Sequence, residues 1–165
     1  MLSKTIFSGF GGQGVLSMGY TLATAAMLEG KHVTYFPSYG VEVRGGTANC
    51  TVAVSDEEIA SPVASEPEFV VAMNQPSFAR FQSILQSGGL IFVNSSIVDV
   101  SSARGDIEIV AVPTSELAER IGTIKVANMI MLGTFIRLSN IISDDFMVKH
   151  LTDVLGQDKA KLIKL

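Results

Sequence analysis

The chain has 165 residues, of which 47% are hydrophobic and 17% are charged, and its formal net charge at pH 7 is −4. This length suits one domain with a full core, over residues 1–165. Because a typical soluble domain has about 25% charged residues, the shortage of charge predicts that part of the surface does not face water. An acidic chain without a basic cluster argues against nucleic acid as a partner.

Cys50 is the only cysteine, which excludes an internal disulfide and leaves this chain unable to hold an iron–sulfur cluster alone. His32 and His150 have no metal-ligand spacing, so we expect neither a metal site nor a catalytic histidine. The amino terminus lacks the pattern of a signal peptide, and the longest apolar segment, residues 126–136, is shorter than the roughly 20 residues that cross a bilayer. We therefore expect a cytoplasmic protein with no membrane span.

A glycine-rich turn lies between a short apolar run at residues 5–8 and a longer one at residues 15–28. This order predicts a strand, a tight turn and a helix, which is a Rossmann-like start. The unpaired N–H groups at the beginning of such a helix attract an anion or contact a partner. The candidate binding residues of the turn are Gly9, Gly11, Gly12, Gln13 and Gly14.

Two nucleotide-binding interpretations of the turn each lack a required residue. A dinucleotide fingerprint needs an acidic residue about 20 positions further on, but the next apolar run, residues 32–36, ends in Pro37 without one. A phosphate-binding loop needs Lys and then Ser or Thr after its last glycine, where this chain has Val15 and Leu16. A purely structural turn and a binding loop both stay open.

The helix expected at residues 15–28 contains no charged residue, and its apolar sequence is interrupted by the small hydroxyl residues Ser17, Thr21 and Thr24. A surface helix normally has a charged outer face. We therefore expect this helix to be covered on both sides, either as the central helix of one domain or because a partner chain covers its outer face.

A loop at residues 37–46 follows the strand expected at residues 32–36. Loops that carry charged and aromatic groups often hold function, although a plain hairpin connection is the alternative. We hypothesise that Tyr39, Glu42 and Arg44 lie near Gln13 as one rim, in which Arg44 binds a carboxylate or a phosphate. The candidate residues of this loop are Ser38, Tyr39, Glu42, Arg44, Gly45 and Gly46.

The rest of the chain alternates between strands and helices. A period of two predicts a strand at residues 47–54 with Cys50 on its buried side as an inert thiol. Further strands are expected at residues 69–73, 90–93 and 107–112, and helices at residues 74–86, 115–121, 125–138 and from Asp144 onward. This order indicates the α/β class, as a three-layer α/β/α domain around a largely parallel, mixed sheet.

For two of these helices the sequence also predicts the first residue and the residues that face inward. Asn74 is expected to cap the helix at residues 74–86, and Asp144 to open the last helix. The inward residues are expected to be Phe78, Phe81 and Leu85 in the first of these helices and Met147, Leu151, Val154 and Leu155 in the last, which Gly156 ends.

Asn128 is the one strongly polar interior residue of the otherwise apolar segment at residues 125–138. A buried amide without a partner costs about 1–3 kcal/mol. We therefore expect its side chain to bond to the backbone of a neighbouring loop, and we also keep it as a candidate rim residue.

Four motifs together resemble the gamma subunit of the 2-oxoacid:ferredoxin oxidoreductases in order and spacing, over residues 4–155. They read Gly-Phe-Gly-Gly-Gln-Gly-Val at residues 9–15, Pro-Ser-Tyr-Gly at 37–40, Arg-Gly-Gly-Thr-Ala-Asn-Cys at 44–50 and Asn-Met-Ile-Met-Leu-Gly at 128–133. The third motif is more similar to the 2-oxoglutarate and 2-oxoisovalerate members than to the pyruvate members. The chain stops before the usual end of the family, which predicts a truncated C-terminal tail.

The resemblance implies a complex that oxidatively decarboxylates a 2-oxoacid, with 2-oxoglutarate favoured, in the presence of coenzyme A. The products would be an acyl-CoA, carbon dioxide and reduced ferredoxin or a similar carrier. It also implies that other subunits, named alpha, beta and a ferredoxin-like delta, hold thiamine diphosphate, Mg²⁺, coenzyme A and the iron–sulfur clusters. This chain would hold no cofactor alone and contribute no catalytic residue; it would assemble the complex and close its substrate or coenzyme A side.

Two functions of other classes stay open at this stage. One is a free-standing nucleotide- or flavin-binding oxidoreductase that uses the turn from Gly9 to Gly14, which a titration of the isolated chain with NAD, FAD or FMN would test. The other is a small-molecule-binding regulatory module, for which a ligand screen is the test.

Overall fold

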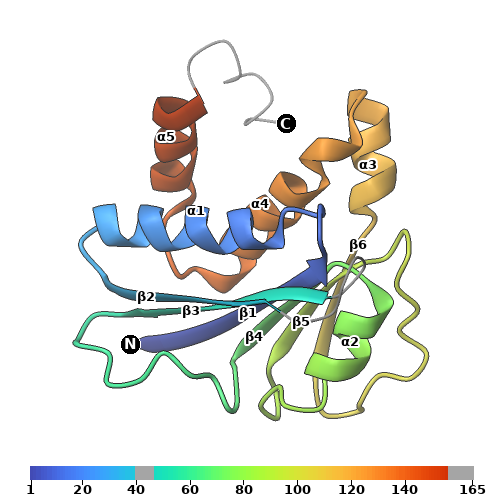
Figure 1. Ribbon diagram of the computed structural model, residues 1–165, viewed down its shortest axis with the longest axis horizontal. Coiled ribbons are helices and arrows are strands. Elements are labelled where there is room, and N and C mark those ends of the chain that lie inside the picture. Colours follow the sequence, from blue (N-terminus) through green and yellow to red (C-terminus); the bar gives the residue numbers. More distant parts are fainter. Residues whose placement is uncertain (40–46, 156–165) are drawn as a thin grey trace.

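The computed structural model describes residues 1–39 and 47–155, with backbone only for Tyr39 and Leu155, and shows one six-stranded sheet with helices on both faces (Figure 1). The strand order is β2-β3-β1-β4-β5-β6. In chain order the elements are β1 (Leu2–Phe10), α1 (Val15–Leu28), β2 (His32–Tyr39), β3 (Thr47–Ser55), β4 (Phe69–Ala72), α2 (Gln75–Phe81), β5 (Leu90–Asn94), β6 (Glu108–Val112), α3 (Thr114–Ile121), the 3₁₀ turn η1 (Ile124–Val126), α4 (Ala127–Ser139) and α5 (Asp144–Leu155).

The sheet is mixed. The pairs β1–β4, β4–β5 and β5–β6 are parallel, whereas β3 is antiparallel to both of its neighbours, β1 and β2. Helices α1 and α4 lie on one face and α2 on the other (Figure 1). The three-layer α/β/α class expected from the alternation of elements is therefore confirmed.

Two hydrophobic clusters hold the layers together. The larger joins α1 and α4 to the sheet through fully buried residues such as Phe7, Leu22 and Phe135, and the rings of Phe7 and Phe135 meet edge to face at 5.3 Å. The smaller lies under α2 and includes Phe78 and Ile91. Each CH₂ removed from water contributes about 0.8 kcal/mol, so these clusters are the main source of stability.

Helix α1 is buried on one side only. Met18 and Leu22 on its inner face are fully buried, while Tyr20, Met27 and Leu28 on its outer face are 62%, 58% and 59% exposed. The expectation that α1 is a central helix, covered on both sides within one domain, is therefore wrong for the part of the chain that the structure describes. The uncharged outer face is open.

Strand β2 runs through Pro37 to Tyr39 instead of ending at residue 36. It is the edge strand of the sheet, and an edge strand tolerates proline because it pairs on one side only. The proline therefore did not end the strand as the sequence pattern predicted.

Helix α2 ends at Phe81, earlier than the expected residue 86. The Gln86 N–H donates to the Pro67 carbonyl at 3.1 Å instead of continuing the helix, so the preceding residues form a turn. Asn74 caps the helix as expected, because its side-chain oxygen accepts from the Ser77 N–H at 2.9 Å. The expected inner residues, Phe78, Phe81 and Leu85, are buried.

The last helix differs from expectation at one residue. In α5, Met147 is buried and Leu151 packs against the core, but Val154 is 65% exposed and does not face inward. The Leu155 side chain and Gly156 lie outside the described residues. None of the described helices is long and apolar enough to cross a membrane.

Candidate functional site

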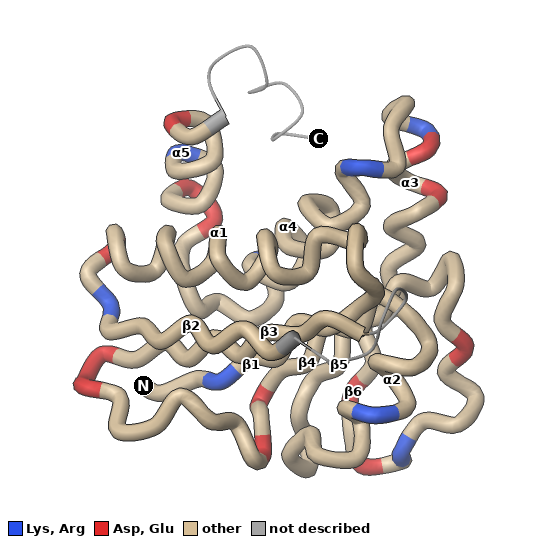
Figure 2. The backbone as a smooth tube through the Cα atoms, viewed as in Figure 1, with Lys and Arg blue, Asp and Glu red and all other residues tan. Residues whose placement is uncertain are grey.

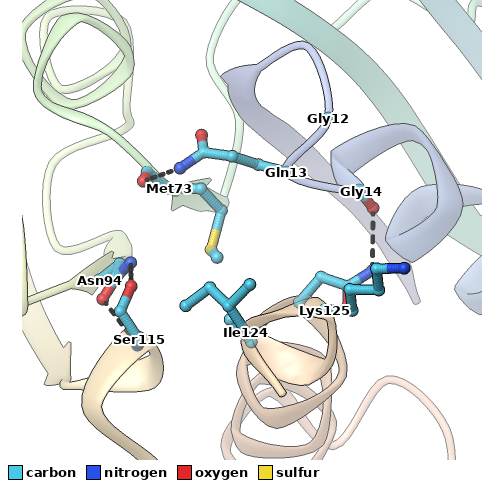
Figure 3. Close-up of a pocket in the computed structure, with 10 residues that line it drawn as sticks. Gly12, Gln13, Gly14, Met73, Asn94, Ser115, Ile124 and Lys125 are labelled. Carbon is cyan, nitrogen blue, oxygen red and sulfur yellow. Dashed lines mark hydrogen bonds between the residues drawn. The ribbon is translucent and has the colours of Figure 1, made fainter. Parts of the chain in front are cut away.

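A cavity of about 190 Å³ opens where β1, β4 and β5 end (Figure 3). The chain leaves β1 for α1 on one face of the sheet and leaves β4 for α2 on the other. Such a divergence creates the crevice in which open α/β sheets bind their ligands. The lining residues are Gly12, Gln13, Gly14, Met73, Asn94, Ser115, Ile124, Lys125, Ala127 and Asn128.

Gln13 fixes the glycine turn to the end of β4. Its side-chain oxygen accepts from the Phe10 N–H at 2.7 Å, and its side-chain nitrogen donates to the Met73 carbonyl at 3.0 Å. The Asn74 amide also reaches the Gln13 oxygen at 3.5 Å. One side chain thus ties the β1–α1 turn to the cap of α2.

Steric contacts explain why two positions of the turn are occupied by glycine. A Cβ at Gly9 would lie 2.6 Å from the Gln13 side-chain oxygen and 2.8 Å from Val15, so only glycine leaves room for the Gln13 contacts. Gly14 caps α1 with a φ of 73°, a left-handed value that favours glycine. A Cβ there would also collide with the Asn128 amide.

Asn128 connects α4 to the same turn. Its amide nitrogen donates to the Gly14 carbonyl at 3.4 Å (Figure 3). Its side-chain oxygen accepts from the Met129 N–H at 2.9 Å. The expected bond from Asn128 to a neighbouring loop's backbone is therefore present.

The opposite wall is built from β5 and α3. The Asn94 amide is buried and donates to the Ser115 hydroxyl at 2.9 Å. Met73 and Ile124 point toward each other across the space between these walls (Figure 3). The cavity thus combines apolar side chains with polar groups, of which Lys125 is the charged one among the described lining residues.

Three helices begin at this cavity, since Gly14 caps α1, Ser115 lies in the first turn of α3, and Ala127 is the first residue of α4. Helix N-termini carry partial positive charge and unpaired N–H groups. Helix α1 has neither a side-chain cap nor an acidic residue in its first turn, whereas α3 has Glu116 there. Side chains already bond the Ser115 and Glu116 N–H groups of α3 and the Met129 N–H of α4. Lys125 is the one charged residue among the described lining residues, so the cavity combines one positive charge with the uncapped N-terminus of α1, which favours an anion over a cation.

The structure brings together part of the candidate set. Gly12, Gln13, Gly14 and Asn128 share the cavity, while Gly9 and Gly11 lie in the same turn without lining it. Ser38 is exposed on β2 and does not line it. Outside the described residues are Glu42, Arg44, Gly45, Gly46 and the side chain of Tyr39.

The predicted rim of Tyr39, Glu42 and Arg44 therefore stays a prediction. The strand register places Tyr39 opposite Ala48 and Ala48 opposite Gly9. The backbone that leads into residues 40–46 is thus in the sheet beside the start of the glycine turn.

The motifs missed several lining residues. Met73 and Asn94 follow or end the parallel strands β4 and β5, and the rule that ligands bind at the carboxyl ends of such strands could have selected both. Ser115, Ile124 and Lys125 carry no local signal, because only the packing of α3 and α4 brings them to this edge.

The donor groups of the described residues do not fit an iron–sulfur cluster or a magnesium site. Cys50 is fully buried, and burial raises the pKa of its thiol to about 12, so it is neither accessible nor ionised. Among the described residues no cluster of His, Cys, Asp or Glu could hold a metal ion, and the cavity has no carboxylate among its described lining residues. The Cys50 thiol is the inert group that the strand pattern predicts.

The family described as pyruvate ferredoxin/flavodoxin oxidoreductase matches residues 4–165. The chain belongs to this family. Within it, the domain is of the gamma-subunit type: the structure of the keto/oxoacid ferredoxin oxidoreductase gamma subunit from Geobacter sulfurreducens superposes with a TM-score of 0.83 and 27% identity, covering 98% of this chain and 91% of that one.

Two curated relatives show the same domain in two settings. The 2-oxoglutarate synthase subunit KorC of Methanocaldococcus jannaschii is 35% identical and matches 99% of this chain and 90% of its own length. The ketoisovalerate oxidoreductase subunit VorA of Methanothermobacter thermautotrophicus is 40% identical over 96% of this chain. The chain spans only 33% of that relative's length.

Proposed function

We propose that this chain is the gamma subunit of a complex that oxidatively decarboxylates a 2-oxoacid with coenzyme A and passes the electrons to ferredoxin or a similar carrier. The observation that carries this proposal is the match to KorC, which covers 99% of this chain and 90% of that subunit. Alpha, beta and ferredoxin-like delta subunits would bind thiamine diphosphate, Mg²⁺ and the iron–sulfur clusters. The favoured substrate is 2-oxoglutarate, with 2-oxoisovalerate as the competitor because VorA is also a relative.

Within the complex, we assign the cavity at Gly12–Gly14 to the coenzyme A side. Coenzyme A carries phosphate groups, and the uncapped N-terminus of α1 and Lys125, which both lie at the cavity, attract an anion. The chain would close this side of the complex over a phosphate while other subunits hold the reacting carbon. The rim of Tyr39, Glu42 and Arg44 belongs to the same proposal.

A reconstitution assay tests the subunit assignment. Alpha, beta and delta subunits are co-expressed with and without this chain, and reduction of methyl viologen is measured with 2-oxoglutarate, 2-oxoisovalerate and coenzyme A. We expect activity only when this chain is present, the higher kcat/KM with 2-oxoglutarate, and none from the isolated chain. Full activity without this chain, or activity from it alone, would overturn the proposal.

The coenzyme A assignment has its own test in the assembled complex. Lys125→Ala should raise the KM for coenzyme A by about ten-fold, because a charge-assisted bond contributes roughly 1.5–3 kcal/mol, while the KM for the 2-oxoacid stays constant. Lys149→Ala, in the exposed part of α5, is the matched control. An unchanged KM for coenzyme A in Lys125→Ala would remove the phosphate from this cavity.

A further inference from the structure

We propose that the outer face of α1 is the surface on which this chain docks onto the partner polypeptide of its complex, an inference that rests on the proposed function. We define the α1 outer stripe as Ser17, Tyr20, Thr24, Met27 and Leu28. Ser17, Tyr20, Thr24 and Met27 are successively three or four positions apart, and Leu28 is four positions after Thr24, so all five lie on one side of the helix. Tyr20, Met27 and Leu28 are 62%, 58% and 59% exposed in this chain alone.

The stripe has the composition of an interface and not that of a solvent face. Figure 2 shows no Lys, Arg, Asp or Glu along the whole of α1, whereas α3 and α5 carry both signs. Permanent protein interfaces are apolar, poor in charge and enriched in Tyr and Met. A helix that faces water normally has a charged outer side instead.

Contacts within the chain already satisfy a polar group of the stripe and order its aromatic ring. The Thr24 hydroxyl donates to the Tyr20 carbonyl at 2.9 Å within the helix, so this polar group keeps a partner when water is excluded. The Tyr20 ring packs edge to face against Tyr35, with centroids 5.9 Å apart. Because the Tyr35 hydroxyl donates to the Leu16 carbonyl at 3.2 Å, the aromatic pair is fixed to the helix. An ordered aromatic anchor loses little entropy on binding.

The relatives indicate which molecule covers the stripe. In VorA the matched region is 33% of the length, so there this domain is continuous with much further polypeptide. In KorC it is nearly the whole chain. A domain that occurs both joined to other polypeptide and as a separate subunit is in permanent association with it. The occupant is therefore a separate subunit that corresponds to the remainder of VorA, with an apolar, uncharged surface.

The position of the stripe relates docking to the cavity. Helix α1 begins at Val15, directly after Gly14, which lines the cavity. A partner seated along α1 would therefore lie beside the cavity. Docking and closure of the coenzyme A side would then involve one continuous surface.

Charge insertion tests the docking surface. Tyr20→Lys/Met27→Lys places two ammonium groups in the stripe, and Leu2→Lys/Val63→Lys makes the same change at two equally exposed apolar residues, 56% and 58% exposed, away from α1. Binding of each purified chain to the immobilised partner subunit is measured, after circular dichroism shows that each is folded. We expect the stripe variant to bind at least about ten-fold more weakly than wild type and the control within about two-fold.

Two results would overturn the inference. One is equal binding by the stripe variant and wild type. The other is a wild-type chain that forms a dimer, which the stripe variant converts to monomer without loss of partner binding, because the occupant is then a second copy.

Hydroxyl-radical footprinting gives a second readout on the unaltered protein. Met27 and Met1 are 58% and 60% exposed in the chain alone, so their oxidation can be compared directly. On assembly, Met27 should be protected several-fold while Met1 stays reactive; equal reactivity of Met27 in the free and assembled chain would contradict docking here. An active complex without protection rejects only the docking surface, whereas protection in a complex inactive with every 2-oxoacid rejects only the proposed reaction.

Discussion

Helices α1 and α3 lie on the same side of the sheet and contribute to one hydrophobic core, yet their outer faces differ. Helix α3 exposes Glu116, Glu119 and Arg120, as expected of a helix that faces water. Helix α1 exposes Tyr20 and Met27 and no charge (Figure 2). The apolar composition of both inner faces is explained by their packing in the core that the two helices share. The outer face of α1 has the composition that the proposed docking onto another polypeptide requires.

The largest expected effect is on the rate at which the Cys50 thiol is labelled, because the inner face of α1 covers this residue. Its thiol is fully buried, and its pKa is raised to about 12 by burial. Labelling by an aromatic disulfide near neutral pH should be at least about 1000-fold slower in the native chain than in urea, since the group reacts only after opening. Rapid labelling of the native chain would show that the inner face of α1 is loosely packed and would weaken the contrast between its two faces.

The next largest effect is expected on the free energy of unfolding, when one methyl group is added to the inner face of α1. A Cβ at Gly19 would collide with the Cys50 sulfur and lie 3.3 Å from the Tyr35 ring. Gly19→Ala should therefore lower the free energy of unfolding by about 1–3 kcal/mol, measured by denaturant titration.

Gly133→Ala in α4 is the matched control for Gly19→Ala. No atom lies within 4 Å of a Cβ at this position, so the higher helix propensity of alanine should stabilise the chain by up to about 1 kcal/mol. Gly19→Ala combined with Cys50→Ala should recover part of the loss. Equal effects of the two glycine replacements would contradict the tight inner packing.

Loss of the Gln13 side chain should lower the free energy of unfolding by about 1–2 kcal/mol. Gln13→Ala leaves the Phe10 N–H and the Met73 carbonyl without the partners that they have at 2.7 Å and 3.0 Å. We expect lower thermal stability and, in the complex, a higher KM for coenzyme A, because the turn before α1 lines the cavity. Gln86→Ala, at an exposed glutamine, is the control. Unchanged stability in Gln13→Ala would show that the turn holds its shape without this side chain.

The smallest effect on stability should come from an exposed ion-pair cluster that is not part of α1's outer stripe. A hydrogen bond from Lys31 at 2.6 Å, followed by one from the N-terminus, lowers the pKa of Asp56 to about 2. Because the folded pKa is below the unfolded value, the stabilisation is present above about pH 4 and is lost as the pH falls through about 2. Asp56→Asn should unfold slightly more easily than wild type at about pH 6 and equally at about pH 1, below the folded pKa. A difference that persists at the lower pH would contradict this origin.

The sequence predicted most of the fold because the elements follow local rules. The glycine turn, the Asn74 cap and the alternation around Cys50 each depend on neighbours within a few positions. Pro37 was misleading because its tolerance depends on β2 lying at the edge of the sheet, which is a tertiary fact. Val154 was misleading because apolar periodicity marks a face without showing whether anything covers it.

The candidate site was predictable only in part for the same reason. Gly14 and Asn128 are 114 positions apart, yet each was selected, one by its motif and the other as an amide in an apolar segment. Lys125 and Ser115 are ordinary residues in sequence, and only the packing of α3 and α4 brings them to the cavity.

The most direct measurement is affinity purification of the tagged chain from its native cells, with the co-purifying proteins identified by mass spectrometry and assayed at once for 2-oxoacid- and coenzyme A-dependent viologen reduction. We expect a stoichiometric complex with thiamine diphosphate-binding and iron–sulfur subunits that is active with 2-oxoglutarate or 2-oxoisovalerate. A chain that purifies without such subunits, or a complex that is inactive with every 2-oxoacid, would contradict it.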